Sequence, residues 1–196
     1  MRVFLGVTGA SGAPYAARLL ASLVAGGCEI GLVASAAGIE VLATELYGDA
    51  TLPREEVLDR FVGASSGQVT VYGINDYTSP YASGAAKVDA YVVCPCSMST
   101  VGTLAAGAMA NLIHRAASVA LKERRRLVLV PRETPLSSIH LRGLATLHEA
   151  GAVILLAAPG FYHGPETIDD LVDFVVARAL DQIGLDNALI PRWGQP

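Results

Sequence analysis

The stretch "VFLGVTGASGAPYAARLL", residues 3–20, decides the fold of this chain. Its first apolar run predicts a strand, and the apolar spacing that begins at Gly12 predicts a helix. Pro14 falls in the first turn of that helix, where a missing N–H costs little, and Gly26 and Gly27 end it. A strand, a glycine turn and a helix in this order are typical of a phosphate-binding unit.

Strands and helices alternate along the rest of the chain. The predicted strands cover residues 3–8, 30–34, 69–72, 90–94, 127–130 and 153–157. The other predicted helices cover residues 36–47, 53–63, 97–110, 112–125, 138–150 and 167–183. Strict alternation implies a parallel sheet with helices on both faces, so we expect an α/β three-layer sandwich that forms a single domain over residues 1–196. The long irregular loop "GINDYTSPYASGAAK", residues 73–87, is typical of a lid or an interface element.

Composition limits the classes of protein to consider. Of the 196 residues, 52% are hydrophobic and 16% are charged, which predicts strands buried on both faces or large buried subunit interfaces. No apolar run reaches the roughly 20 residues of a membrane span, and the amino-terminal apolar stretch is short and broken by glycines, so we interpret it as a strand and not as a signal peptide. The net charge of −4 argues against nucleic acid as a partner. Three cysteines, two of them at Cys94 and Cys96, form no disulfide framework, and we expect a cytoplasmic protein.

The glycine turn fits a mononucleotide better than a dinucleotide. Gly6, Gly9 and Gly12 are spaced G-x-x-G-x-x-G, which differs from the G-x-G-x-x-G of dinucleotide sites. The second predicted strand ends in Ser35, where an NAD site usually has an acidic residue that holds the ribose. A turn that only reverses the chain is the alternative interpretation at this point.

Four other motifs are set aside. "GASSG" (63–67) has the G-x-S-x-G pattern of hydrolases, but a helix precedes it and a strand follows it, which is the wrong order. "DDLVD" (169–173) lies in the first turns of a helix, where acidic residues favour the helix dipole, and a magnesium site of the polyprenyl synthase kind needs two such motifs. The C-x-C pair and the four histidines show no metal-ligand spacing, so we expect no metal site. "KERRR" (122–126) is consistent with a helix end rich in cations.

Polar residues follow several predicted strands. "CPCSMST" puts Ser97, Ser99 and Thr100 at the start of a helix, "VPRE" puts Arg132 and Glu133 after another strand, and "PGFYHGP" puts Tyr162 after the last strand. The carboxyl ends of parallel strands meet at one edge of a sheet, so we expect these groups and the first glycine turn to face the same edge.

At these residues the chain resembles the flavin prenyltransferases of the UbiX type, long described as phenolic or 3-polyprenyl-4-hydroxybenzoate decarboxylases. The segments that carry the resemblance are "GVTGASGAPYAARLL", "ATE", "CPCSMST", "NLIHRAASVALKERRRLVLVPRETPLSSIHL", "PGFYH" and "PRWG". The resemblance implies a Rossmann-like subunit that binds FMN and attaches a dimethylallyl group, taken from dimethylallyl phosphate, to N5 and C6 of the reduced flavin. It also implies a homo-oligomer, a dodecamer with sites between neighbouring subunits, and a UbiD-type decarboxylase of ubiquinone synthesis or aromatic acid metabolism that receives the prenylated FMN.

The resemblance implies a role for each matching residue. The residues that match flavin contacts are Gly9, Ala10, Ser11, Ser35, Ser97, Met98, Ser99, Thr100 and Arg132. The residues that match the dimethylallyl phosphate site are Arg115, Lys122, Tyr162 and Arg178, with Ser11 close to the same phosphate. The residues that match catalytic positions are Ser11, the acids Glu45 and Glu133, and the aromatic Trp193.

The chemistry of prenyl transfer needs side chains of these types. The C–O bond breaks with release of phosphate, and without a metal the Arg and Lys cations and a tyrosine hydroxyl must stabilise the leaving charge. Bond formation at C6 expels a proton, which a carboxylate must accept or pass to phosphate, and Glu45 and Glu133 are both candidates. Taken singly, Arg178, Lys122 and Glu45 would be ordinary solvent-facing helix residues.

Two other functions are open to the same fold. The first is an FMN-dependent decarboxylase that acts on a cysteine-containing peptide or a pantothenate derivative, but those enzymes resemble each other in a P-x-M-N-x-x-M-W stretch where this chain has "GAMANLIHRA". The second is a flavin-storing or assembly protein, which would not need a second anion site. The sequence leaves open the choice between monophosphate and pyrophosphate donors and the pathway that is served.

Overall fold

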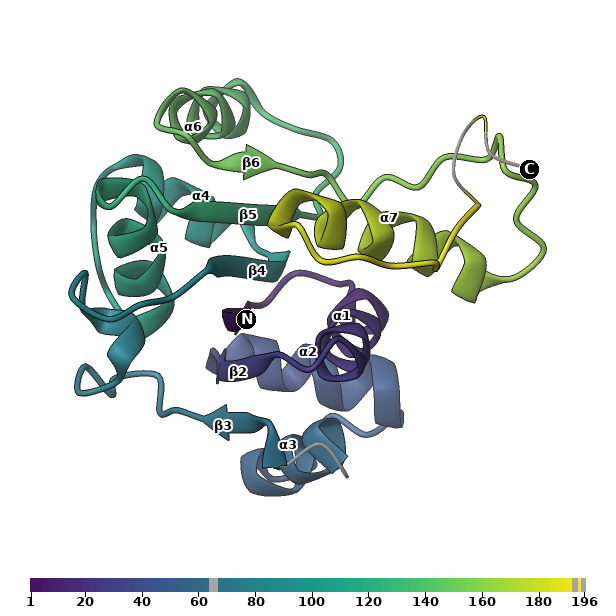
Figure 1. The fold of residues 1–196 in the computed structure, drawn as a ribbon, viewed down its shortest axis with the longest axis horizontal. Helices are drawn as coiled ribbons and strands as arrows, with labels where there is room; N and C mark the ends of the chain where they lie inside the picture. The colour runs from purple at the N-terminus through teal and green to yellow at the C-terminus, as the bar shows by residue number, and fades with distance from the viewer. Residues whose placement is uncertain (64–66, 192–193, 195–196) are drawn as a thin grey trace.

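Six parallel strands form one sheet in the part of the chain that the structure describes, which is residues 1–63, 67–191 and 194 of a computed structural model (Figure 1). The strands are β1 (Arg2–Val7), β2 (Glu29–Ala34), β3 (Val69–Val71), β4 (Ala90–Cys96), β5 (Arg126–Pro131) and β6 (Val153–Ile154). Their order across the sheet is β3-β2-β1-β4-β5-β6, and every neighbouring pair is parallel. This confirms the predicted parallel sheet.

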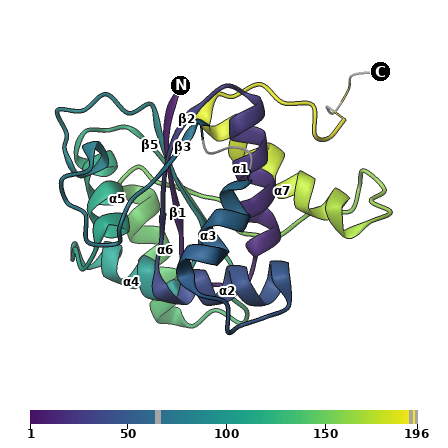
Figure 2. The same ribbon diagram turned by 90° about the horizontal axis from the view of Figure 1, so that it is seen from below.

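Helices cover both faces of the sheet. They are α1 (Ala13–Ala25), α2 (Ala36–Tyr47), α3 (Arg54–Val62), α4 (Met98–Ala105), α5 (Leu112–Lys122), α6 (Ser138–Glu149) and α7 (Ile168–Ile183), with a 3-10 turn, η2 (Pro80–Ala82). One buried cluster joins the sheet to α1, α2, α3 and α7, and a second joins it to α4, α5 and α6. Figure 2 shows α1, α3 and α7 on one side of the sheet and α4, α5 and α6 on the other, which confirms the three-layer sandwich.

The strand order creates a switch point between β1 and β4. From β1 the chain moves outward to β2 and β3, and it then returns to the other side of β1 to add β4, β5 and β6. The register pairs Val7 with Ala34 and Gly6 with Val93, so β1, β2 and β4 end close together at one edge. Open α/β sheets bind ligands at the carboxyl ends of the strands beside such a switch point. The glycine turn after β1 and the serine-rich turn after β4 both lie there.

Two helices are shorter than predicted. The helix expected over 97–110 ends at Ala105, because Gly107 takes a left-handed φ of 70° and its N–H turns back to the carbonyl of Leu104 at 2.9 Å. The helix expected over 112–125 ends at Lys122, since Arg124 has a φ of 53° that no helix accommodates. In each case the apolar spacing continues past the end of the helix, and a residue in the left-handed conformation ends the helix earlier.

The last strand is also shorter than predicted. Regular strand geometry covers Val153–Ile154, and the expected strand ran over 153–157. Backbone bonding to β5 nevertheless continues, because the N–H groups of Leu155 and Ala157 donate to the carbonyls of Leu129 and Pro131 at 2.9 Å. The predicted segment therefore follows β5 along its whole length, and only its geometry becomes irregular.

The long loop over 73–87 is partly built into the core. Its middle forms η2, and the ring of Tyr81 is fully buried against Phe4, with ring centroids 5.3 Å apart. Burial of this ring raises the pKa of the Tyr81 phenol. The middle of the loop is therefore fixed on the sheet, which does not fit a lid that opens as a whole.

Candidate active site

The turns after β1 and β4 are hydrogen-bonded to each other. The buried Thr8 hydroxyl donates to the carbonyl of Pro95 at 2.9 Å and accepts from the N–H of Ser97 at 2.7 Å. The Thr8 N–H also donates to Pro95, at 3.2 Å. One threonine thus fixes the position of the glycine turn relative to the start of α4.

A carboxylate lies on the first N–H groups of α1. Oε2 of Glu45, near the end of α2, accepts from the N–H of Gly12 at 2.9 Å and from that of Ala13 at 2.8 Å. Pro14 follows and has no N–H, so the carboxylate satisfies the donors with which α1 begins. The sequence alone suggested that these donors could bind a ligand phosphate. In the structure they are taken by Glu45.

The same carboxylate lies beside Ser11 and Arg132. Partial burial by itself would raise the pKa of Glu45, but the Ser11 hydrogen bond, the two backbone N–H groups and the positive charge of Arg132 together lower it below its ordinary value. Nε of Arg132, just after β5, donates to the carbonyl of Ser11 at 3.2 Å. Three residues predicted from distant segments thus meet at the switch point.

Serine caps begin α2 and α4, which follow the neighbouring strands β2 and β4. The Ser35 hydroxyl accepts from the N–H of Gly38 at 3.0 Å at the start of α2. At the start of α4 the Ser97 hydroxyl accepts from the N–H of Thr100 and lies 3.1 Å from the Thr100 hydroxyl. Met98 and Thr100 are buried and Ser99 is exposed, so Ser99 is the member of this turn that faces outward.

Glu133 lies next to Arg132 at the end of β5. Its side chain is exposed, and its Oε1 accepts from the N–H of Thr134 at 3.1 Å. The two predicted acids therefore differ in their bonding: Glu45 accepts from two N–H groups at the start of α1, and among the described residues Glu133 accepts only from the N–H of the next residue.

Tyr162 and Arg178 lie on the α7 side of the sheet. Tyr162 is 67% exposed and packs edge-on against Phe174, with ring centroids 5.7 Å apart. Arg178 is exposed and lies 3.7 Å from the carboxylate of Asp181. Phe174, which contacts Tyr162, lines a cavity of about 270 Å³ beside β6 together with Arg178.

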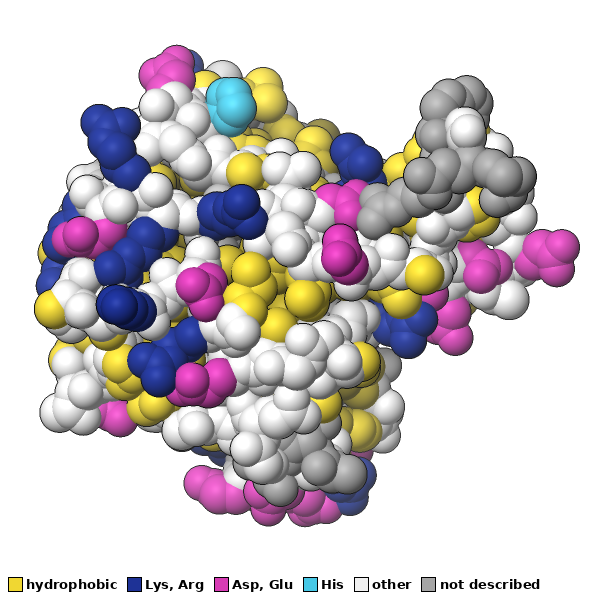
Figure 3. Space-filling view, viewed as in Figure 1, with side chains coloured by type: hydrophobic (Ala, Val, Ile, Leu, Met, Phe, Trp, Pro, Cys, Tyr) yellow, Lys and Arg dark blue, Asp and Glu magenta, His cyan; other side chains and the backbone are white. Residues whose placement is uncertain are grey.

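Arg115 and Lys122 lie elsewhere in the same chain. Both belong to α5, which covers the face of the sheet opposite to α7. Nε of Arg115 donates to the carbonyl of Ala82 at 2.9 Å, and Lys122 pairs with Glu123. Lys122 comes four residues before β5 begins, so it lies near the amino-terminal edge of the strands, on the order of 20 Å from their carboxyl ends. Figure 3 shows basic side chains clustered over α5 and β5. One chain by itself does not bring these two cations to Tyr162 and Arg178.

Some predicted residues lie outside the described part of the chain. Trp193 is one of them, and so are residues 64–66 of the "GASSG" motif. The elements around that motif are α3 before it and β3 after it, which confirms the order that argued against a hydrolase elbow.

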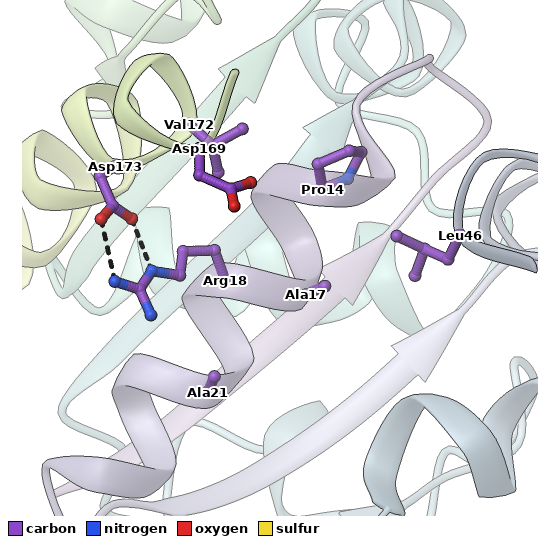
Figure 4. Close-up of a pocket in the computed structure, with 8 residues that line it drawn as sticks. All are labelled: Pro14, Ala17, Arg18, Ala21, Leu46, Asp169, Val172 and Asp173. Atoms are coloured by element: carbon purple, nitrogen blue, oxygen red, sulfur yellow. Dashed lines mark hydrogen bonds and ion pairs between the residues drawn. The ribbon is translucent and has the colours of Figure 1, made fainter. Parts of the chain in front are cut away.

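The acidic motif at the start of α7 has structural roles. The Asp170 carboxylate accepts from the N–H groups of Glu166 and Thr167 in a capping box, and these bonds lower its pKa. Asp173 forms a two-point ion pair with Arg18 of α1, at 2.5 and 2.9 Å. This pair borders a cavity of about 460 Å³ between α1, α2 and α7, shown in Figure 4, and none of the predicted site residues lines it.

The three cysteines are buried in the fold, and so is His114. Cys28, Cys94 and Cys96 are free thiols, and burial raises the pKa of Cys94 to about 12. His114 is buried, which lowers the pKa of its imidazole, and His140 completes the capping box of α6. Within the described residues there is no group of three or more His, Cys, Asp or Glu side chains that could hold a metal ion. Of the helices in those residues, none has the length and apolar character to cross a membrane.

Sequence reasoning missed two residues of this neighbourhood. Thr8 was taken only as the last residue of a strand, although a lone hydroxyl between an apolar strand and a glycine turn is a usable signal. Phe174 gave no signal, because a phenylalanine on the apolar side of an amphipathic helix is expected to be core. Only the tertiary structure shows that it contacts Tyr162.

Comparison with known proteins gives one consistent result. The flavoprotein family profile matches residues 1–180. The flavin prenyltransferase UbiX of Pseudomonas aeruginosa is 51% identical over 199 residues, which cover 99% of this chain and 94% of the relative. The crystal structure of AnUbiX (PadA1) in complex with FMN and dimethylallyl pyrophosphate has a TM-score of 0.86 and 39% identity, and the match covers 99% of this chain and 97% of that one. A dodecameric FMN-dependent UbiX-like decarboxylase from Escherichia coli O157:H7 has a TM-score of 0.86 and 38% identity over the full length of both chains.

Proposed function

We propose, since the chain belongs to the flavin prenyltransferases of the UbiX type, that it transfers a dimethylallyl group from dimethylallyl phosphate to reduced FMN. The observation that carries this proposal is the meeting of Ser11, Glu45 and Arg132 beside the Ser97 turn at the β1–β4 switch point. Residues 1–196 act as one domain.

The residues at this edge fit FMN. The exposed Gly9 and Ser11 offer backbone and hydroxyl groups, and Gly9 has no room for a side chain, because a Cβ there would lie 2.5 Å from Cβ of Ala37. Because Glu45 takes the N–H groups of Gly12 and Ala13, the phosphate of FMN is expected at the starts of α2 and α4, where each serine cap takes only one N–H group. The full set proposed to hold FMN is Gly9, Ala10, Ser11, Ser35, Ser97, Met98, Ser99, Thr100 and Arg132. Reduced FMN supplies N5 and C6 as the nucleophilic atoms that accept the prenyl group.

The donor phosphate is held by cations. Tyr162 and Arg178 of one chain, together with Arg115 and Lys122 of a neighbouring copy, stabilise the negative charge that grows as the allylic C–O bond breaks. The separation of α5 from α7 within one chain supports the contribution of a second copy, and the similar Escherichia coli protein is a dodecamer. We therefore propose a dodecamer with sites between subunits. Trp193 contributes an aromatic face that helps to exclude water.

Proton release is assigned to the acids at the same edge. Glu45, held by fixed donors with a lowered pKa, keeps its charge and orients Ser11. Glu133, exposed beside Arg132, is the better placed of the two to accept the proton lost from C6 or to pass it to the departing phosphate. The product, prenylated FMN, serves a UbiD-type decarboxylase, and we propose that this takes place in the cytoplasm.

Mass spectrometry of the flavin tests the proposal directly. The protein is incubated without oxygen with reduced FMN and dimethylallyl phosphate, and the flavin is then extracted. The pyrophosphate donor is tested in parallel. We expect a flavin heavier by one C5H8 unit. Unmodified FMN with both donors, from protein shown to bind FMN, would contradict the proposal and favour an FMN-dependent decarboxylase of cysteine-containing substrates.

A further inference from the structure

An aromatic cluster joins the loop after β6 to the outer side of α7. Phe174 of α7 stacks on His163, with ring centroids 5.2 Å apart and planes inclined by 17°. Tyr162 meets both of these rings edge-on, at 5.7 Å from Phe174 and 5.8 Å from His163. Edge-to-face and stacked arrangements at these distances are the favourable ones for aromatic pairs.

The loop backbone comes close to this cluster at Gly160. A Cβ on Gly160 would lie 3.0 Å from Cζ of Phe174 and 3.1 Å from Cε1 of Tyr162. The backbone two residues before Tyr162 therefore lies directly against the two rings. Packing on Phe174 thus fixes the backbone of the loop as well as the ring of Tyr162.

Around this cluster the chain projects from the body of the molecule. Figures 1 and 2 show the segment between β6 and α7 extending away from the sheet. Phe161 is 71% exposed and Ile168 is 75% exposed, so the residues that flank the cluster pack little. The ring of Phe174, which also packs against the core cluster of α1 and α7, is the bridge from this segment to the core.

Arg178 lies one helical turn beyond Phe174. Residues four apart share one face of a helix, and both side chains line the cavity beside β6. Phe174 therefore contacts the ring of Tyr162 and shares a cavity wall with Arg178. These are the two residues of one chain that are proposed to hold the donor phosphate.

We propose that Phe174 is a positioning residue for the prenyl donor: its ring sets the place of the Tyr162 hydroxyl relative to the Arg178 guanidinium. This inference rests on the proposed function. His163 stacks on the Phe174 ring and meets the Tyr162 ring edge-on, so it acts on Tyr162 through these ring contacts and not through contact with the donor.

The test is the kinetics of Phe174→Leu with the wild-type protein measured alongside. Aromatic pairs of this kind contribute energies that correspond to a change of up to about tenfold. We expect KM for dimethylallyl phosphate to rise by about tenfold, with kcat and the dissociation constant of FMN changed less than about twofold. Phe174→Tyr, which keeps the ring, should restore the wild-type KM. In a Tyr162→Phe background, Phe174→Leu should have no further effect on KM, because the hydroxyl it positions is gone.

The matched control is Phe61→Leu, the same change in the same core cluster, on α3 and away from Tyr162. It should lower stability and leave KM for the donor unchanged. If Phe174→Leu does not fold, His163→Leu removes the other ring of the stack, and the same rise in KM for the donor is expected. Two results would overturn the inference while the wild type still makes prenylated FMN. One is an unchanged KM, and the other is a rise in KM matched by equal falls in kcat and FMN affinity. A wild type that makes none would overturn the proposed function, and the inference with it.

Discussion

Glu45 shows how a single side chain prepares the site. The first helix begins with a glycine and a proline and has no side-chain cap of its own, and the carboxylate supplied by α2 takes over that task. The bonds that stabilise the start of α1 also hold the carboxylate beside Ser11 and Arg132. A structural cap and a proposed catalytic group are therefore the same atoms.

Glu45→Gln should therefore reduce stability in a pH-dependent way. The mutation leaves an oxygen that can accept from α1 but removes its negative charge, and we expect the free energy of unfolding to fall by about 1 kcal/mol at pH 7. The folded-state pKa of Glu45 is lowered, so its contribution is fully present above the ordinary pKa of a glutamate, about 4.3, and is lost as the pH falls through the lowered value. Urea denaturation of both proteins between pH 7 and pH 3 measures this difference.

The control for this prediction is Glu40→Gln, an exposed glutamate on the same helix. It should leave the free energy of unfolding within about 0.5 kcal/mol of the wild type at both ends of the pH range. A Glu45→Gln deficit that stays constant down to pH 3 would mean that the charge of the carboxylate is not what stabilises α1.

Serine caps begin three of the described α-helices, but only two of these helices start at the proposed flavin site. Ser35, Ser97 and Ser137 all accept a hydrogen bond from the N–H three residues later. The caps of α2 and α4 follow β2 and β4 directly, at the edge beside the switch point. The cap of α6 follows a loop, and no flavin-binding residue is proposed on that helix.

Ser97→Ala and Ser137→Ala should separate stability from binding. Each loses one cap, so each is expected to lower the free energy of unfolding by about 1 kcal/mol. Only Ser97→Ala should also weaken FMN binding, because that helix start is proposed to face the phosphate. Denaturant unfolding and titration of FMN, followed by flavin fluorescence, measure the two effects. An equal loss of FMN affinity in both variants would remove the start of α4 from the proposed site.

Element boundaries also show the limits of sequence patterns. The positions of strands and helices were predicted well, because strands buried on both faces appear as short continuous apolar runs and helices as apolar residues at 3.6-residue spacing. The ends of α4 and α5 were wrong by several residues, since they depend on the left-handed conformations of Gly107 and Arg124. Arginine has no preference for the left-handed conformation, so the sequence does not predict it at Arg124.

The whole molecule presents its proposed phosphate ligands in two separate groups. Tyr162 and Arg178 lie on the α7 side of the sheet, and Arg115 and Lys122 lie on α5, across the sheet from them. A single phosphate cannot touch both groups of one chain. Under the proposed dodecamer, each site takes one group from each of two copies.

Mixed oligomers test this arrangement. Lys122→Ala and Arg178→Ala should each retain FMN and lose prenyl transfer. When the two variants are co-expressed in equal amounts, roughly a quarter of the sites receive an intact group from each copy, so about a quarter of the wild-type activity should return. The yield of prenylated flavin measures it.

The matched control is the co-expression of Lys122→Ala with Arg115→Ala. Both residues lie on α5, so no copy in the mixture supplies an intact α5 group and no activity should return. Recovery in this control, or no recovery with the first pair, would contradict a site divided between α5 of one copy and α7 of another.

The sequence by itself determined the parallel sheet, its two covered faces and the strand ends that carry polar residues, because burial periodicity and turn chemistry are local properties. It also indicated the family through matching segments. Only the tertiary structure decided that Glu45 occupies the start of α1, that Thr8 joins two turns, and that Phe174 packs against Tyr162. Each of these contacts joins residues that are distant in the chain, and their partners are set by how the elements pack rather than by any local pattern.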